Sequence, residues 1–152
     1  MQNIITWFLK QNATTIFLLF FLGIPQCLWY YSIVTEFDKK NKIDNNLKKA
    51  VINFTTLYPI LYFVFFPFYM IYNIMNSDRI GLENILQYHF LAMFCVLISL
   101  ILTANSFSTF EKNNKKESFG NVGNFFLFWF FIFGVWILQP KINSYIEQKN
   151  TV

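Results

Sequence analysis

The sequence predicts an all-α membrane protein, a bundle of four transmembrane helices joined by short loops. The 20 charged side chains of the 152-residue chain are spread unevenly, because four stretches of 25, 28, 27 and 23 residues contain no Asp, Glu, Lys or Arg. Each stretch is long enough to cross a hydrocarbon core of about 30 Å, which takes about 20 apolar residues. The 55% hydrophobic content and the mean hydropathy of +0.39 exclude disorder, and the long uncharged stretches exclude an ordinary soluble domain.

The uncharged stretches also determine the expected element boundaries. We predict spanning helices at about residues 13–33, 51–74, 82–104 and 124–139, with loops at about 34–50 and 105–123. The charged segments are too short and too broken to form a second hydrophobic core. The whole chain, residues 1–152, is therefore expected to be a single transmembrane domain.

Glycine and proline residues refine this prediction. Gly23 and Pro25, near the end of the first span, predict a kink there. Pro59 and Pro67 predict a bent second span, which lipid tolerates if neighbouring groups satisfy the freed carbonyls. Beyond the fourth span, apolar residues return at helical spacing, which predicts a short interfacial helix at about 140–149.

The distribution of Lys and Arg predicts the orientation. Loops 34–50 and 105–123 carry eight of the 12 Lys and Arg residues, and the remaining segments carry four. The positive-inside rule then places these two loops in the cytoplasm and both termini outside.

The lysines of these loops are the first candidate binding surface. Lysines beside apolar spans are usually topology determinants and contacts to anionic lipid headgroups. The sharper hypothesis is that the two loops form one basic patch that docks an acidic cytosolic protein. Nucleic acid is not expected as a partner, because these lysines flank the apolar spans. The residues are Lys39, Lys40, Lys42, Lys48, Lys49, Lys112, Lys115 and Lys116.

The sequence offers no group of residues suited to catalysis or to metal binding. Metal sites need clustered His, Cys, Asp or Glu, whereas this chain has one His and two distant cysteines, Cys27 and Cys95. It has no nucleophile elbow, phosphate-binding glycine loop or paired carboxylates. We therefore expect a non-enzymatic protein with no catalytic residue, no metal and no cofactor.

A second candidate site lies near the start of the third predicted span. Among Asp, Glu, His, Lys and Arg, His89 is the one residue inside a span and away from its ends, so it is either a hydrogen-bonded neutral imidazole or a pH-sensitive switch. Glu83 and Gln87 are four residues apart and share a helix face. They are either a helix-start carboxylate with its amide neighbour or the entrance of a cation path.

These patterns favour a multi-pass membrane subunit that acts as an anchor, a sensor or a scaffold. The phenylalanine-rich faces of the second and fourth spans exceed what four helices can bury, which favours a homo-oligomer. An analogy of size and topology suggests a bacterial defence or stress module in the inner membrane. The alternative is an oligomeric pore, lined by Thr, Asn and Tyr of the second and third spans, with lysine rings at its mouths.

Overall fold

The computed structural model of the protein describes residues 2–21, 23–75 and 82–147, and the side chains of these except residues 2 and 82–84. In this part of the chain 88% of the residues are helical and no strand occurs, which confirms the all-α class. The helices are α1 Gln2–Lys10, α2 Ala13–Phe20, α3 Ile24–Lys40, α4 Asn46–Met75, α5 Leu82–Asn113, α6 Gly120–Trp129 and α7 Phe131–Glu147.

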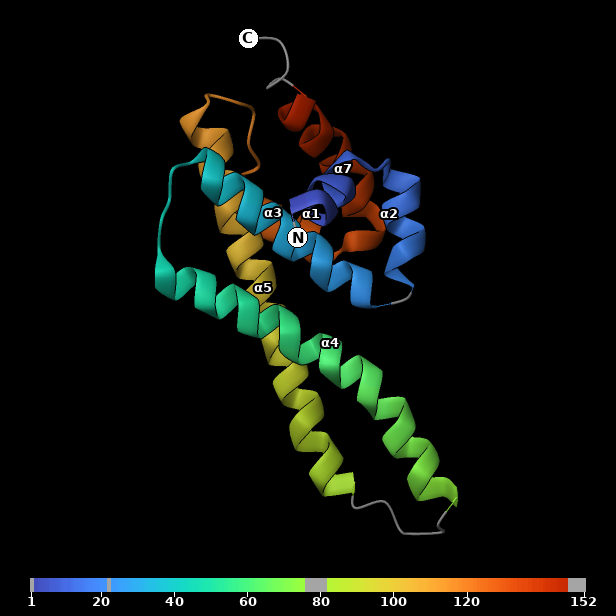
Figure 1. The fold of residues 1–152 in the computed structure, drawn as a ribbon. Helices are drawn as coiled ribbons and strands as arrows, with labels where there is room; N and C mark the ends of the chain where they lie inside the picture. Colours follow the sequence, from blue (N-terminus) through green and yellow to red (C-terminus); the bar gives the residue numbers. More distant parts are fainter. Residues whose placement is uncertain (1, 22, 76–81, 148–152) are drawn as a thin grey trace.

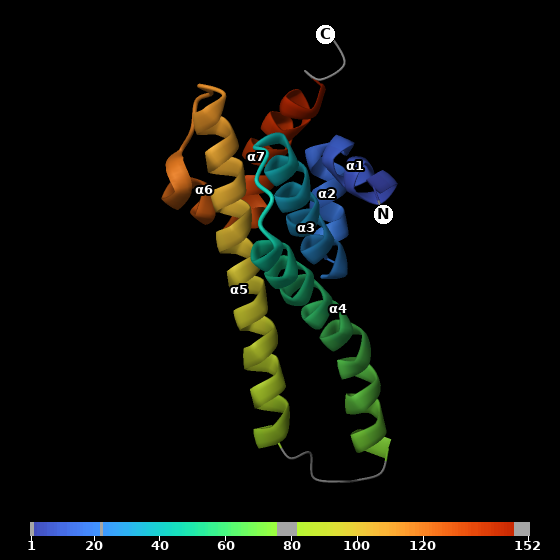
Figure 2. The same cartoon turned by 60° about the vertical axis from the view of Figure 1, so that its left-hand side comes forward.

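The helices divide into a compact body and a projecting pair, as Figures 1 and 2 show. The long helices α4 and α5 run antiparallel, and the end of α4 and the start of α5 extend well beyond the other helices. The second half of α5 packs into the body against α3 and α6. Helices α1 and α2 each contact both α3 and α7. We call α4 and α5 the hairpin.

Only the hairpin, among the described residues, has helices long and apolar enough to cross a membrane. The most apolar 18 consecutive residues of Asn46–Met75 and of Ile85–Asn113 have mean hydropathies of 1.6 and 2.2. Only 22% of the most apolar part of each is buried against the rest of the chain. Such extensive exposed apolar surface marks contact with lipid or with another protein. Two of the four predicted spans are thus candidate spans, and the four-helix bundle is not confirmed.

The first predicted span, residues 13–33, is two helices in the structure. The chain ends α2 at Phe20, reverses its direction and begins α3 at Ile24 (Figures 1 and 2). Gly23 precedes α3 with a φ of +70°, in the left-handed region where a side chain is strained. Pro25 then occupies the first turn of α3, where its missing N–H is not needed. The expected kink is therefore a complete break.

The fourth predicted span, residues 124–139, is also broken. Phe130 leaves the helical conformation, with a ψ of +57°, and separates α6 from α7. The two helices pack so closely at Gly134 that a Cβ on this residue would lie 1.7 Å from the carbonyl oxygen of Leu127. Since only glycine permits this approach, Gly134 allows the chain to fold back where the hydropathy pattern predicts a straight helix.

The predicted loops and tail are largely helical and partly buried. Only residues 41–45 separate α3 from α4, so most of the predicted loop 34–50 is helix. Helix α5 continues to Asn113, deep into the predicted loop 105–123, and buries Phe107 and Glu111. The helix predicted at about 140–149 forms the end of α7 as far as Glu147, where Ile142 is buried in the body, and residues 148 and 149 lie outside the described part.

An aromatic core holds the body together. Trp29, Phe107 and Phe128 are fully buried, and the rings of Trp29 and Phe107 contact that of Phe128 edge to face at 5.4 and 5.9 Å. This arrangement is favourable because the positive edge of one ring meets the negative face of the next. Buried Gln139 of α7 also links this helix to α3, because its side chain accepts a hydrogen bond from the Trp29 indole at 2.9 Å.

Candidate functional site

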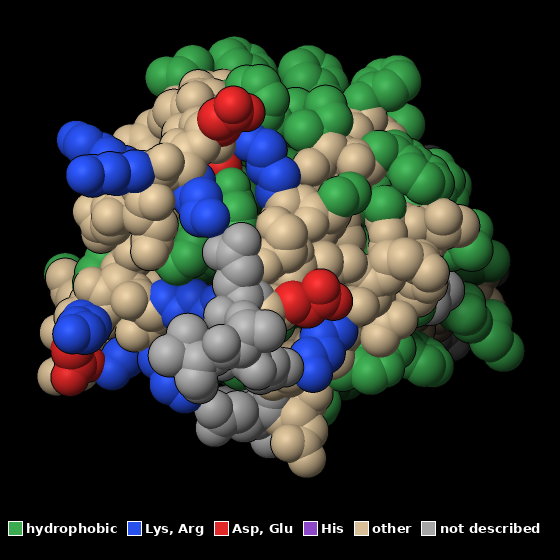
Figure 3. Space-filling model, turned by 90° about the horizontal axis from the view of Figure 1, so that it is seen from above, with side chains coloured by type: hydrophobic (Ala, Val, Ile, Leu, Met, Phe, Trp, Pro, Cys, Tyr) green, Lys and Arg blue, Asp and Glu red, His purple; other side chains and the backbone are tan. Residues whose placement is uncertain are grey.

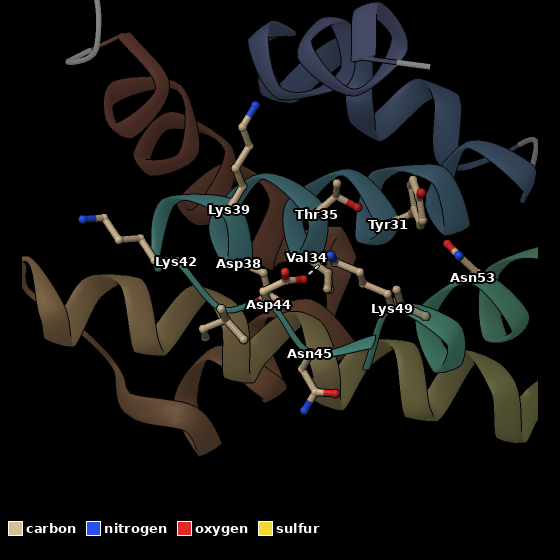
Figure 4. Close-up of a pocket in the computed structure, with 12 residues that line it drawn as sticks. Tyr31, Val34, Thr35, Asp38, Lys39, Lys42, Asp44, Asn45, Lys49 and Asn53 are labelled. Carbon is tan, nitrogen blue, oxygen red and sulfur yellow. Dashed lines mark hydrogen bonds and ion pairs between the residues drawn. The ribbon is translucent and has the colours of Figure 1, made fainter. Parts of the chain in front are cut away.

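A pocket of about 460 Å³ lies between the end of α3 and the start of α4, beside the connection 41–45 (Figure 4). Lys39, Lys42 and Lys49 line it together with Asp38 and Asp44. In Figure 4 the side chains of Lys39 and Lys42 extend outward from the end of α3, whereas that of Lys49 reaches Asp44. The remaining lining is apolar or uncharged and includes Tyr31, Val34, Thr35, Ile52 and Asn53.

The end of α3 has a Schellman geometry that places Lys42 in the pocket wall. The amide of Ile43 donates to the Asp38 carbonyl at 2.9 Å and that of Lys42 to the Lys39 carbonyl at 3.2 Å. This motif requires a left-handed residue, usually glycine, and here it is Lys42 with a φ of +56°. A non-glycine residue at such a position is strained, which is typical of functional sites.

The same Schellman cap occurs at the end of α5. The amide of Lys116 donates to the Glu111 carbonyl at 2.9 Å, that of Lys115 to the Lys112 carbonyl at 3.2 Å, and Lys115 has a φ of +51°. Both basic loops therefore begin with a helix cap in which a lysine takes the position that glycine normally occupies.

Two lysines at the start of α4, Lys48 beside the pocket and Lys49 in its lining, form ion pairs with carboxylates of the pocket. The Nζ of Lys48 lies 2.8 Å from the Asp38 carboxylate and donates to Ser106 Oγ at 2.8 Å, which joins α3, α4 and α5. Lys49 pairs with the exposed Asp44. The hydrogen bond from Lys49, together with its positive charge, lowers the pKa of Asp44. Lys39 and Lys42 are exposed.

The two predicted lysine clusters lie at the same end of the body. Asn113 donates to Asn41 at 3.3 Å, so the end of α5 touches the connection after α3. Lys40 donates to the carbonyl of Tyr145 at 2.6 Å, and Lys116 lies over the ring of the same tyrosine at 5.9 Å. We call residues 39–49 and 112–116 the basic end. Figure 3, a view from above, shows several Lys side chains on this face of the molecule.

A buried carboxylate at this end was missed by the sequence reasoning. Glu111 is fully buried, and its Oε2 accepts a hydrogen bond from Asn124 at 2.8 Å. Its Oε1 lies 3.5 Å from both Lys141 Nζ and the Tyr145 hydroxyl. Burial and the negative charge of Glu111 raise the pKa of Tyr145. The sequence predicts a loop at 105–123, although no Gly or Pro precedes Glu111 in that segment to end the helix.

The second candidate site is only partly assembled. His89 lies on the hairpin, where its Nδ1 is 3.0 Å from the Tyr62 hydroxyl of α4. Gln87 is exposed on α5, and the side chain of Glu83 lies outside the described residues. This contact is the kind expected of a hydrogen-bonded imidazole.

In the described part of the chain no group of three or more His, Cys, Asp or Glu side chains is placed to hold a metal ion. Comparisons of this chain with protein-family models, curated proteins and solved structures gave no match. Functional inference therefore depends on the geometry of the hairpin and of the basic end.

Proposed function

We propose that this chain is a non-enzymatic membrane subunit that acts as an anchor and scaffold: the hairpin crosses the bilayer, and the basic end recruits an acidic cytosolic protein. The observation that carries the proposal is the placement of the hairpin relative to the lysine clusters. The hairpin exposes apolar side chains that include Phe65, Phe68 and Phe94, and Figure 1 shows that its tip lies at the opposite end of the molecule from the ends of α3 and α5, which carry the lysine clusters.

The membrane part of the proposal follows from the cost of exposed apolar surface. Phe65 and Phe68 are 63% and 67% exposed on α4, and Phe94 is 58% exposed on α5. Each buried large apolar side chain contributes about 1.5–3 kcal/mol relative to exposure to water, so lipid contact stabilises the hairpin strongly. We expect the protein to stay with membranes in alkaline carbonate and to enter solution only with detergent. Release by carbonate alone would contradict the anchor.

The recruitment part depends on the exposed lysines at the basic end. Replacing Lys39, Lys42, Lys112 and Lys115 together with Glu reverses the charge while leaving the ion pair of Lys48 intact. We expect this variant to lose the proteins that the parent retains after cross-linking in membranes. Lys10→Glu, a change at an exposed lysine of α1, is the matched control and should retain them. An identical set of retained proteins in both variants would overturn this part of the proposal.

The pore alternative has less support from the described residues. Ser99 of α5 donates to the Thr55 hydroxyl of α4 at 2.9 Å, and Thr103 donates to the Ser99 carbonyl at 2.7 Å. These hydroxyls are buried in the contact between the two helices and do not line a lumen of one chain. Conductance of the reconstituted protein in a planar bilayer tests the pore directly.

Self-association and an inner-membrane location in bacteria belong to the same proposal. Exposed aromatic side chains on both α4 and α6, such as Phe68 and Phe126, support self-association, because they can pack against a second copy as well as against lipid. The mass of the protein in nanodiscs of defined size tests it: a monomer at every protein-to-disc ratio would exclude it.

A further inference from the structure

We infer that α2–α3 and α6–α7 are re-entrant hairpins. Each enters the bilayer from the basic end, turns among the acyl chains and leaves on the side where it entered. This inference rests on the proposed crossing of the bilayer by α4 and α5. It replaces two of the four predicted spans with segments that contact one leaflet, and it assigns an interaction surface for lipid to the turns of the body.

The α6–α7 turn lies beside the middle of the apolar part of α5. At 1.5 Å per residue, a core of about 30 Å takes about 20 residues, which from Ile85 extends to about Ala104. A cavity of about 290 Å³ is lined by Met93 and Leu97 of α5 together with Trp129 and Phe131, which flank the α6–α7 turn. Met93 and Leu97 are about 12 and 18 Å along the helix from Ile85. The turn therefore lies near the middle of the core.

The α2–α3 turn lies beside the middle of α4. A Cβ on Gly23, in the turn between α2 and α3, would lie 3.7 Å from the ring of Phe63. Phe63 is 12 residues before Met75, the last residue of α4, which corresponds to about 18 Å of helix. Both turns therefore reach a similar depth, although they are more than 100 residues apart in the sequence.

The third argument is the hydrogen bonding of the turns. Irregular backbone within a bilayer requires its polar groups to be satisfied by the protein, because lipid offers no partners. The amide of Gly23 donates to the Phe20 carbonyl at 2.9 Å, and that of Gly134 donates to the Phe130 carbonyl at 2.9 Å. The Tyr30 hydroxyl donates to the Phe128 carbonyl at 3.1 Å, so α3 satisfies a group near the end of α6.

The side chains at the two turns suit an apolar surrounding. Phe21 is 77% exposed beside the α2–α3 turn, and Phe133 is 73% exposed beside the α6–α7 turn. No charged residue occurs from 11 to 35 or from 118 to 140, which covers both turns. Among the described residues, the turns therefore combine exposed aromatic rings with paired amides at Gly23 and Gly134, as a segment immersed in lipid requires.

The fourth argument is the distribution of charge. With re-entrant hairpins, the segments that hold 11 of the 12 Lys and Arg residues lie on the side of the basic end, and Arg79 alone lies on the other. Four complete spans would divide the same residues eight to four. The positive-inside rule is thus satisfied far better, and it places both termini in the cytoplasm, opposite to the orientation expected from four spans.

Sidedness of labelling tests this topology. Single cysteines replace Asn12, Lys42, Ser77 or Ser144 in the full-length chain with Cys27→Ala and Cys95→Ala, and a membrane-impermeant maleimide is applied to right-side-out and inverted vesicles. We expect Asn12→Cys, Lys42→Cys and Ser144→Cys to react only in inverted vesicles and Ser77→Cys only in right-side-out vesicles. Four spans would instead give Asn12→Cys and Ser144→Cys the same sidedness as Ser77→Cys, which would overturn the inference. Reaction of all four cysteine variants from one side would mean that α4 and α5 do not cross the bilayer, and the proposed anchor would fail.

Depth of the turns gives an independent readout. Nitroxide labels on Phe21→Cys and Phe133→Cys, both at exposed positions, should be relaxed more by oxygen than by a water-soluble nickel complex, because oxygen concentrates in the acyl region. A label on Lys10→Cys, at an exposed position on α1, should show the opposite preference. Nickel-dominated relaxation at the two turns would contradict their immersion, even if the sidedness agreed.

Discussion

The hydrogen bonds of the Gln139 side chain lead to a quantitative prediction about the stability of the body. Its Oε1 accepts the indole N–H of buried Trp29 at 2.9 Å, and its Nε2 donates to the Gln11 carbonyl at 2.8 Å and to Asn143 Oδ1 at 3.0 Å. One side chain of α7 thus links α3 to the residue that follows α1. Gln139→Leu keeps most of the volume of the side chain but removes these three bonds and the longer ones from Nε2 to the carbonyls of Phe8 and Leu9, at 3.4 and 3.3 Å.

The expected magnitude follows from the groups that lose their partner. The Trp29 indole N–H is fully buried and would be left without an acceptor, which costs about 1–3 kcal/mol. The Gln11 carbonyl is only partly buried, so water can replace the amide and the loss there is about 1 kcal/mol. We therefore expect Gln139→Leu to lower the free energy of unfolding by about 2–4 kcal/mol.

The assay is unfolding of the purified protein in mixed micelles, followed by far-ultraviolet circular dichroism. Repeating Gln139→Leu in a Trp29→Phe background completes a double-mutant cycle, in which the indole donor is already absent. The cost of Gln139→Leu should fall by about 1–2 kcal/mol there. Gln87→Leu, which changes an exposed amide on α5, is the matched control and should stay within about 0.5 kcal/mol of the parent. An equal cost of Gln139→Leu in both backgrounds would refute the coupling.

Three further changes test the helix break, the buried carboxylate and the strained cap. Gly134→Ala places a methyl group 1.7 Å from a backbone oxygen, so we expect unfolding to become easier by about 3 kcal/mol; an unchanged midpoint would mean that α6 and α7 do not pack this closely. Glu111→Gln removes the anion beside Lys141, and we expect a loss of about 2 kcal/mol in the same micelle assay, whereas a gain would show that the pair is unfavourable. Lys42→Gly relieves the positive φ and should stabilise the protein by about 1 kcal/mol, and destabilisation would contradict the strain.

The all-α class and the hairpin could be predicted because both depend on local composition. The uncharged stretches 50–77 and 84–110 correspond to α4 and α5, the two helices that qualify as spans. A continuous helix of that length needs no tertiary partner to satisfy its backbone, so the pattern of charge and hydropathy is sufficient.

The breaks near Gly23 and Phe130 could not be predicted in the same way. Hydropathy reports whether a segment avoids water, and a helix that crosses lipid and one that turns back within it have the same composition. The α6–α7 reversal depends on contact between Gly134 and the backbone of Leu127, and the hydropathy of the segment does not report which glycine makes such a contact.

The candidate site also combines features that the sequence predicts with features that only the tertiary structure determines. The eight lysines were recognisable from their type and spacing, because cations flank spans for electrostatic reasons. Their division into paired and exposed groups depends on Asp38, Asp44 and Ser106, which lie on different elements. The burial of Glu111 could not be predicted, because its partners Asn124 and Tyr145 lie 13 and 34 residues away.

The local pattern of charge and hydropathy thus determined that this chain is helical, that its hairpin is apolar and that its lysines lie at the ends of apolar segments. These properties are local to each segment and do not depend on which distant residues meet. Packing decided where the chain reverses, which carboxylate is buried and which lysines remain exposed. Each of these outcomes depends on one close approach between distant residues, and the free energy of such an approach exists only once both partners are in place.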